Sequence, residues 1–418
     1  MKQPAPKAAA SKKASAKEVV LPSSEKSAEI ASYYGFTIID TPTVTKDDLQ
    51  KTRRDLEIEP ARYEDSLHLV VHPEEKVAIL RTYLEKDLVN GPQPVLFYYE
   101  GTMLQEGEKA KKHKPDEHIF HMDMIGTSKS IAEATLIKIA YELLREEGYE
   151  KISVSINSIG DKESMNRFCK ELANFYRKNI NDLSPHCRQL LKRDPFEVYE
   201  CTDEKCKGGK EHCPNPISYL TEQSRIHFKE VLEYLETLSI PFEIHNFLVC
   251  NRKMWSQTAF ALYDEHGTEL ARGVRYNAVA KKIGFKKDTG AIGITVRYTR
   301  PKKSQRKGAL TVKPPLVYFI QLGFEAKLKS LIVIEILRKA KVPIAQALNR
   351  DKIGVQIQSA ETDRIPYTII MGQKEAMENS VIVREMRTRS QESVPFSQLG
   401  EYIKKTVTEY EQNKKKGR

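Results

Sequence analysis

The sequence is poor in several features that would each point to a particular kind of protein. Its 418 residues include one tryptophan and six cysteines, and no run of 18 or more apolar residues occurs. A chain without such a run has no helix that spans a membrane, and its N-terminus lacks the apolar segment of a secretory signal. Cysteine this sparse does not require disulfides, and a reducing compartment keeps thiols free. These absences predict a soluble, cytoplasmic protein.

Acidic residues are absent from three basic segments. The net charge is +11 with a pI near 9.1. Residues 1–17 hold five lysines, residues 300–313 hold six cations, and the end of the chain, NKKKGR, holds four more. Terminal basic runs are often only solvated tails. Several clusters in one basic chain nevertheless favour a polyanionic partner, RNA before membrane.

The length suggests more than one domain. Composition and charge divide the chain, and no internal repeat is visible. The pattern predicts a disordered basic tail over 1–20, a core domain over 21–300 with a helical, cysteine-rich insertion at about 160–240, a basic linker over 301–315, a second domain over 316–412 and a basic tail over 413–418.

The order of periodic segments predicts an α+β fold. Residues 130–149 have the 3.6-residue period of an amphipathic helix. Strands are expected at 66–72, at 94–108, at 117–125 and repeatedly between 241 and 300, where turn residues separate them. This alternation indicates an antiparallel sheet with helices packed on one face. After the linker, strands and helices alternate, which predicts a small α/β domain.

Several stretches in the same order resemble the histidyl-tRNA synthetase family of class II aminoacyl-tRNA synthetases, over roughly residues 22–410. They are YYGFTIIDTPTV, VVHPEEKVAILR, LFYYEGTMLQEGEKAKKHKPDEHIFHMDMIG, SINSIGD, SPHCRQLLKRDPFEVYEC and DRIPYTIIMGQKEAMENSVIVREMRTRSQ. The resemblance implies a class II antiparallel sheet flanked by helices, a C-terminal α/β anticodon-binding domain, a homodimer and a tRNA partner. A shared fold does not establish activity.

Amino-acid activation brings two anions together, so the enzyme needs cations aimed at the α-phosphate. In the resembled enzymes an arginine stands where this chain has Leu104, two residues before Glu106, and a second arginine stands at Cys250. Glu106 and Arg297 match ATP-binding positions. ATP and Mg²⁺ are therefore expected only if the protein is active. The plainer interpretations are a core leucine in a strand, a buried inert cysteine and a surface arginine.

The resemblance also implies an amino-acid pocket. Glu74 matches the glutamate that receives the substrate amine, while Lys76 replaces a threonine. Asp123 is a candidate for the second pocket carboxylate, with Ile119 in place of a glutamine. The other pocket candidates are Cys250, Arg252, Trp255 and Tyr276. Trp255 is large enough to fill the pocket, which is also the ordinary role of a core aromatic.

Two further substitutions narrow the expected site. Val274 and Ala278 replace glycines, which would have allowed backbone to approach a ligand. Arg252 shares a strand face with Cys250 in an extended chain, displaced by about 7 Å. It is therefore a candidate for restoring the lost charge, together with Lys253 or Lys76.

Two clusters suggest further ligands. Cys201, Cys206, Cys213 and His212 supply the four ligands that zinc prefers, although the alternative is a solvated loop with reduced thiols. Lys109, Lys111, Lys112 and Lys114 form a dense run suited to RNA phosphates, and a solvated loop is an equal alternative.

Three functions follow from these patterns. The first is a synthetase-like protein with a degenerate active site that binds tRNA or other RNA, or regulates a partner. The second is an active but divergent histidine–tRNA ligase. The third is a regulatory subunit of an ATP phosphoribosyltransferase, although such subunits usually lack the anticodon-binding domain.

Overall fold

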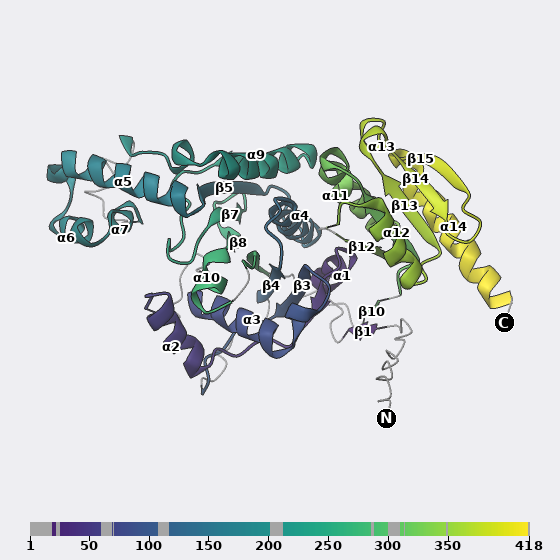
Figure 1. Ribbon diagram of the computed structural model, residues 1–418, viewed down its shortest axis with the longest axis horizontal. Coiled ribbons are helices and arrows are strands. Elements are labelled where there is room, and N and C mark those ends of the chain that lie inside the picture. The colour runs from purple at the N-terminus through teal and green to yellow at the C-terminus, as the bar shows by residue number, and fades with distance from the viewer. Residues whose placement is uncertain are drawn as a thin grey trace, which may run out of the picture.

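The described part of the chain forms three sheets, and the two larger ones each have their own helices (Figure 1). The computed structural model describes residues 19–21, 26–59, 69, 71–107, 117–200, 212–285, 288–299, 310–312, 314–347 and 350–416. Within this part of the chain, no helix is long and apolar enough to cross a membrane.

The larger sheet has eight strands, and all but two of its strand pairs are antiparallel; β2–β3 and β5–β6 are parallel. This arrangement confirms the predicted antiparallel core. The spatial order is β2 (Thr37–Ile38), β3 (Val95–Glu100), β4 (Glu117–Ile125), β9 (Ala291–Thr299), β8 (Glu269–Arg275), β7 (Gln257–Tyr263), β5 (Ser153–Gly160) and β6 (Phe242–Ile244).

Helices cover both faces of this sheet, whereas the sequence predicted helices on one face only. The prediction was wrong because the central strands bury side chains of both parities, so their alternation is weak. One face packs on α1 (Lys26–Tyr33), α4 (Ile131–Glu146) and α9 (Glu222–Thr237). The other packs on α3 (Pro73–Glu85), α5 (Lys162–Lys178), α7 (Pro195–Glu200) and α10 (Asn277–Lys282).

The remaining elements of this part are short or lie outside the two layers. They are α2 (Lys46–Asp55), which contacts α3, α6 (Pro185–Arg193), and the 3₁₀ turns η1 (Leu88–Asn90), η2 (Ile180–Asp182) and η4 (Pro216–Tyr219). The sequence did not predict α2 or α10.

Other predicted boundaries differ from the structure. The strand expected over 94–108 ends at Glu100, because Gly101 turns the backbone with φ 85°, a conformation that only glycine adopts freely. The strand expected over 66–72 lies mostly outside the described residues, and residues 71–72 are not in a strand.

The C-terminal domain is a five-stranded mixed sheet with helices, the α/β arrangement that the sequence predicted. Its order is β12 (Ile344–Gln346), β11 (Val317–Gln321), β13 (Tyr367–Met371), β14 (Ser380–Glu385) and β15 (Gln391–Pro395). The first three are parallel and the last two pair antiparallel. Its helices are α11 (Phe324–Lys339), α12 (Ile353–Thr362), α13 (Gln373–Met377) and α14 (Phe396–Lys416).

Two segments expected to lack structure pair with each other. Strand β1 (Val19–Leu21) is antiparallel to β10 (Leu310–Val312). The sequence placed the first mainly in the disordered tail and the second in the linker. The pairing joins residues about three hundred positions apart, so local composition held no signal for it.

Helix α11 joins the two domains by packing against α1, α4 and α9 (Figure 1). The guanidinium of Arg338 on α11 donates to Glu335 at 2.8 Å and to Glu146 of α4 at 2.6 Å. The hydroxyl of the fully buried Tyr34, which directly follows α1, lies 3.5 Å from Glu335. A partly buried charged cluster therefore fixes the domains relative to each other.

A buried ion-pair network anchors the end of strand β8 to the helices beneath the sheet. Arg275 and Glu133 have no exposed side-chain surface, and their groups are bonded at 2.7 and 2.6 Å. The ring of His227 on α9 lies 2.8 Å from the same carboxylate. These partners hold the pKa of Glu133 at about 2, even though burial alone would raise it. Arg275 precedes Tyr276, so the network positions a side chain of the site described below.

We predict that Glu133→Gln lowers the free energy of unfolding by about 3 kcal/mol, because Arg275 would keep a buried charge without a counter-charge. Since the folded pKa of Glu133 is depressed, its stabilisation is present above the unfolded value of 4.5 and is lost as pH falls toward about 2. The deficit of the variant, measured by urea unfolding, should therefore shrink over that interval.

The matched control is Glu222→Gln on the exposed first turn of α9, which should change stability by about 0.5 kcal/mol or less. A deficit of Glu133→Gln that stayed constant with pH would contradict the assignment of the network.

Candidate active site

The candidate site lies on the sheet face that packs against α3, α5, α7 and α10. Cross-strand partners in an antiparallel sheet project to the same side, so the register defines two rows across this face. One row is Phe97, Asp123, Gly293, Val274, Ala259 and Asn157; the next is Tyr99, His121, Thr295, Arg272, Ala261 and Ser155. Most predicted pocket residues lie in these rows or against them.

An internal ion pair occupies the middle of the face. The ammonium group of Lys76, in the first turn of α3, lies 3.0 Å from Asp123 Oδ1, and both side chains are almost completely buried. The Tyr276 hydroxyl donates to the same oxygen at 2.7 Å. Burial raises the pKa of Asp123 above its usual value, while Lys76 and Tyr276 pull it back. A lysine of the protein thus neutralises the predicted pocket carboxylate.

Gly293 makes this pair possible. A β-carbon at that position would lie 2.1 Å from Asp123 Oδ1 and 2.8 Å from Lys76 Nζ. Any side chain there would displace the carboxylate or the ammonium group. The glycine at position 293 of strand β9 therefore leaves the space that the Lys76–Asp123 contact needs.

His121, which the sequence analysis did not single out, lies beside this pair. Its Nε2–H donates to the Gly101 carbonyl at 3.1 Å, so its Nδ1 accepts from the Thr295 hydroxyl at 3.0 Å. Burial and the nearby Lys76 charge lower the pKa of His121 to about 3, so the ring is neutral near pH 7. The signal was available, because His121 and Asp123 are two residues apart on one strand and share a face.

Glu74 keeps a buried carboxylate with few partners. Its side chain is fully buried, and neither oxygen accepts a hydrogen bond within the described chain. The His72 ring lies 3.5 Å from Oε1. Burial lowers the pKa of His72, but the Glu74 contact and Glu75 raise it overall. A buried carboxylate this poorly satisfied is suited to a ligand that donates hydrogen bonds.

The stretch around the single tryptophan forms a tight turn. The Asn251 carbonyl accepts from Met254 N at 3.0 Å and Trp255 N at 2.8 Å. Met254, Trp255 and Cys250 are buried in the core cluster with α3, α5 and α10. Cys250 and Trp255 therefore fill space beside the site, in agreement with the plainer interpretation of both residues.

An arginine missed by the sequence analysis projects from the second row. Arg272 on β8 forms a two-pronged contact with Glu269 at 2.6 and 2.8 Å. Burial lowers the pKa of Arg272, but Glu269 and the nearby Cys250 raise it above its ordinary value. A guanidinium from β8 thus lies close enough to Cys250 to interact with it, and that guanidinium is engaged by a carboxylate.

The predicted rescue by Arg252 is wrong. Its Nε lies 2.5 Å from Asp194, at the junction of α6 and α7, so the side chain does not project from the sheet face. The reason is the turn, which ends the extended geometry that the prediction assumed. Lys253 likewise contacts Glu57, at 3.3 Å.

The expected phosphate-binding positions do not converge. Leu104 is half-buried in an irregular segment after β3. The plainer interpretation, a core leucine in a strand, is therefore wrong. Glu106 is exposed, and its Oε2 lies 3.5 Å from Lys46 N. Arg297, on the site face, lies 3.9 Å from Glu117. Among the described residues, Glu106 and Arg297 are the expected ATP-binding side chains, and each lies next to another group of the protein.

The remaining sequence candidates contribute little to this face. Cys201, Cys206, Lys109, Lys111, Lys112 and Lys114 lie outside the described residues. Cys213 donates to the Tyr176 hydroxyl at 3.6 Å, and His212 is exposed. Among the residues with described positions, no group of three potential ligands could hold a metal ion.

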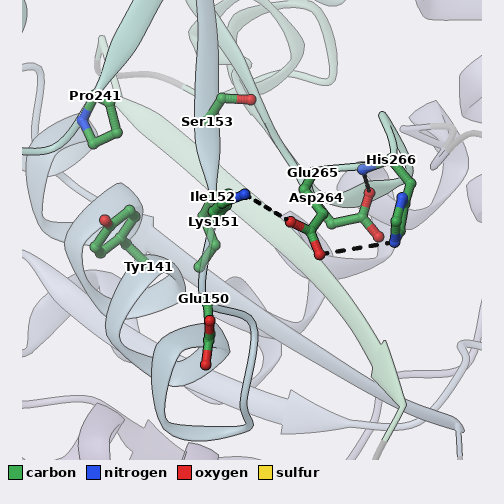
Figure 2. A pocket seen from close by; sticks show the side chains of 9 residues that line it. All are labelled: Tyr141, Glu150, Lys151, Ile152, Ser153, Pro241, Asp264, Glu265 and His266. Atoms are coloured by element: carbon green, nitrogen blue, oxygen red, sulfur yellow. Dashed lines mark hydrogen bonds and ion pairs between the residues drawn. The ribbon is translucent and has the colours of Figure 1, made fainter.

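A surface hollow of about 620 Å³ lies elsewhere, where β5 begins and β7 ends (Figure 2). Lys151 and Glu265 form an ion pair of 3.3 Å in it. None of the predicted site residues lines this hollow, and we do not assign it to the site.

Comparison with known proteins agrees with this architecture. The model of the anticodon binding domain matches residues 317–406. The histidine–tRNA ligase of Geobacillus sp. (strain WCH70) is 27% identical over 352 residues, covering 81% of this chain and 82% of that protein. That of Dehalococcoides mccartyi (strain 195) is 25% identical over 396 residues, covering 92% and 94%. The chain belongs to the histidyl-tRNA synthetase family.

Among solved structures, the apo histidyl-tRNA synthetase of S. aureus overlays with a TM-score of 0.49 at 21% identity, covering 90% of this chain and 93% of that one. Family membership rests on the sequence relatives and on the C-terminal domain, and the anticodon-binding domain expected from sequence is confirmed.

We predict that Lys76→Met lowers the free energy of unfolding by about 3 kcal/mol at pH 7, because Asp123 loses its counter-charge. The pKa of Asp123 is already raised, and loss of Lys76 raises it further, so ionisation of Asp123 destabilises the folded state as pH rises. Urea unfolding should show the deficit growing between pH 4 and pH 7.

The double variant Lys76→Met/Asp123→Asn provides the control. It should recover much of the lost stability at pH 7, since neither charge remains. Strictly additive effects of the two substitutions would show that the groups do not interact.

Proposed function

We propose that this member of the histidyl-tRNA synthetase family binds RNA without activating histidine. The observation that carries the proposal is the buried Lys76–Asp123 ion pair. An ammonium group of the protein engages the carboxylate that the family resemblance assigns to an amino-acid substrate. A substrate ammonium would have to displace it, at the cost of leaving two charges buried.

The charges around the site support the same proposal. Three arginines on or beside the site face each lie next to a carboxylate of the protein, in pairs joining Arg272 to Glu269, Arg252 to Asp194 and Arg297 to Glu117. A transition state with charge building on a phosphate needs cations that are aimed at it. Both arginine positions of the resembled site are occupied by Leu104 and Cys250, which cannot supply that charge.

RNA is the partner that the rest of the chain favours. The C-terminal domain matches the anticodon binding domain, and the net charge is +11. We propose a homodimer that binds tRNA or a related RNA, as the family suggests. The match also weighs against a regulatory subunit of an ATP phosphoribosyltransferase, since such subunits usually lack this domain.

An active but divergent histidine–tRNA ligase is the second candidate, and two observations favour it. The buried Glu74 carboxylate accepts no well-formed hydrogen bond in the described chain and has the His72 ring at 3.5 Å, an environment that suits a substrate amine. Arg272 lies close to Cys250 and would restore a cation if it were released from Glu269.

The exchange of labelled pyrophosphate into ATP separates the two candidates. We expect the histidine-dependent rate to be at least about 10⁴-fold below that of an intact histidine–tRNA ligase, because two cationic contacts that each contribute about 10²–10³ are missing. Exchange comparable to that enzyme would reject the proposal and establish the second candidate.

A tRNA titration tests the RNA half of the proposal. Binding should weaken by at least about tenfold between 50 and 200 mM salt, because phosphate contacts release counterions. The same titration of a variant that lacks residues 1–17 measures how much the basic tail contributes to tRNA binding. Binding that is undetectable at low salt with the full chain would contradict an RNA partner.

A further inference from the structure

A cluster of cations surrounds the turn Asn251–Met254 at the edge of the site. The turn projects Arg252 and Lys253 away from the core while Met254 and Trp255 are buried. Lys282, the last residue of α10, donates to the Lys253 carbonyl at 3.0 Å. Lys162 is the first residue of α5, and its charge acts on Lys282. Three separate elements therefore bring positive charge to one place.

The negative charge in the same place is smaller. Arg252 bonds Asp194 through Nε only, and neither Nη donates to another described residue. Lys253 contacts the carbonyl of Glu57 at 2.9 Å and its exposed carboxylate at 3.3 Å. Four cations therefore face two carboxylates, which leaves two positive charges without a counter-charge.

Lys282 has an environment that opposes its own charge. Burial lowers the pKa of its ammonium group, and Lys253, Arg252 and Lys162 lower it further, while Glu57 acts in the opposite direction. Lys282 is exposed, and the like charges beside it disfavour its ammonium form unless an anion joins it. The arrangement is therefore better suited to a bound state than to the free protein.

We propose that Arg252, Lys253 and Lys282 form a site for phosphate groups, which under the proposed function belong to an RNA strand. The two free Nη donors of Arg252 match the two-pronged geometry in which guanidinium binds phosphate oxygens. The lysines add point charges beside it. Two consecutive backbone phosphates carry the two negative charges that the cluster lacks.

The same chemistry fits a free polyphosphate, and the experiment separates the two sources. One arm measures the binding of a fluorescent single-stranded RNA of twelve nucleotides to the protein, by fluorescence anisotropy at several salt concentrations. The other arm titrates inorganic pyrophosphate and follows Trp255, the only tryptophan of the chain, which is buried three residues from Arg252.

Lys282→Gln is the main test because its amide can still donate to the Lys253 carbonyl and its charge is unfavourable in the free protein. We expect it to weaken RNA binding by about three- to tenfold and to reduce the slope of log K against log salt by about 0.7, one phosphate contact. The urea midpoint of unfolding of Lys282→Gln should be equal to or higher than that of the unsubstituted protein. Arg252→Gln should have a comparable effect on binding.

The matched control is Arg225→Gln on the exposed surface of α9, which removes the same charge away from the turn. A loss of RNA binding in Lys282→Gln but not in Arg225→Gln supports a backbone phosphate site. A Trp255 response to pyrophosphate that Lys282→Gln abolishes supports a site for a free polyphosphate.

The proposal is overturned if neither probe binds, or if Lys282→Gln and Arg252→Gln bind both probes as tightly as the control does. Failure of the proposed function would look different, since it would appear as histidine-dependent exchange while the phosphate site retained its sensitivity to Lys282.

Discussion

The contact between the Lys76 ammonium and the Asp123 carboxylate determines what the site-bearing face of the sheet can accept. Both groups are buried, and each would be costly to bury alone. Tyr276 adds a hydrogen bond to the same oxygen, and Gly293 leaves the space that the pair occupies. The anchoring of Arg275 to Glu133 beneath the sheet places Tyr276, so residues on both faces support this one ion pair.

Pairing of charges within the protein also extends over the rest of the face. Arg252, Arg272 and Arg297 each lie next to a carboxylate of the protein, and the neutral His121 is held by the Gly101 carbonyl and the Thr295 hydroxyl. Such a surface is internally satisfied and has little charge left for a reacting phosphate. Unbalanced positive charge is found instead at the turn beside the site, where α5, α10 and the Arg252 turn meet. The chain thus separates a neutralised interior from a cationic rim.

Much of the architecture could be predicted from local patterns. Strand β4 over Glu117–Ile125 and the helix ending near Glu146 follow from alternation and from the 3.6-residue period. The antiparallel order of the core and the C-terminal α/β domain follow from segment order. The turn at Asn251–Met254 was missed because hydrogen bonds to one carbonyl override a stretch that looks extended. Arg272 was missed because its significance depends on strands that are distant in sequence, whereas His121 could have been found from its place two residues before Asp123 on the same strand.

The sequence alone determined the family resemblance, the missing cations at Leu104 and Cys250, and the presence of Lys76 and Asp123 at pocket positions, because residue identity is enough to exclude a charge. Only the tertiary structure decided which charges pair. Lys76 and Asp123 are separated by 47 positions, Arg275 and Glu133 by 142, and Arg252 and Asp194 by 58. Register and helix packing bring these groups within hydrogen-bonding distance, and electrostatic pairing depends on that distance rather than on order along the chain.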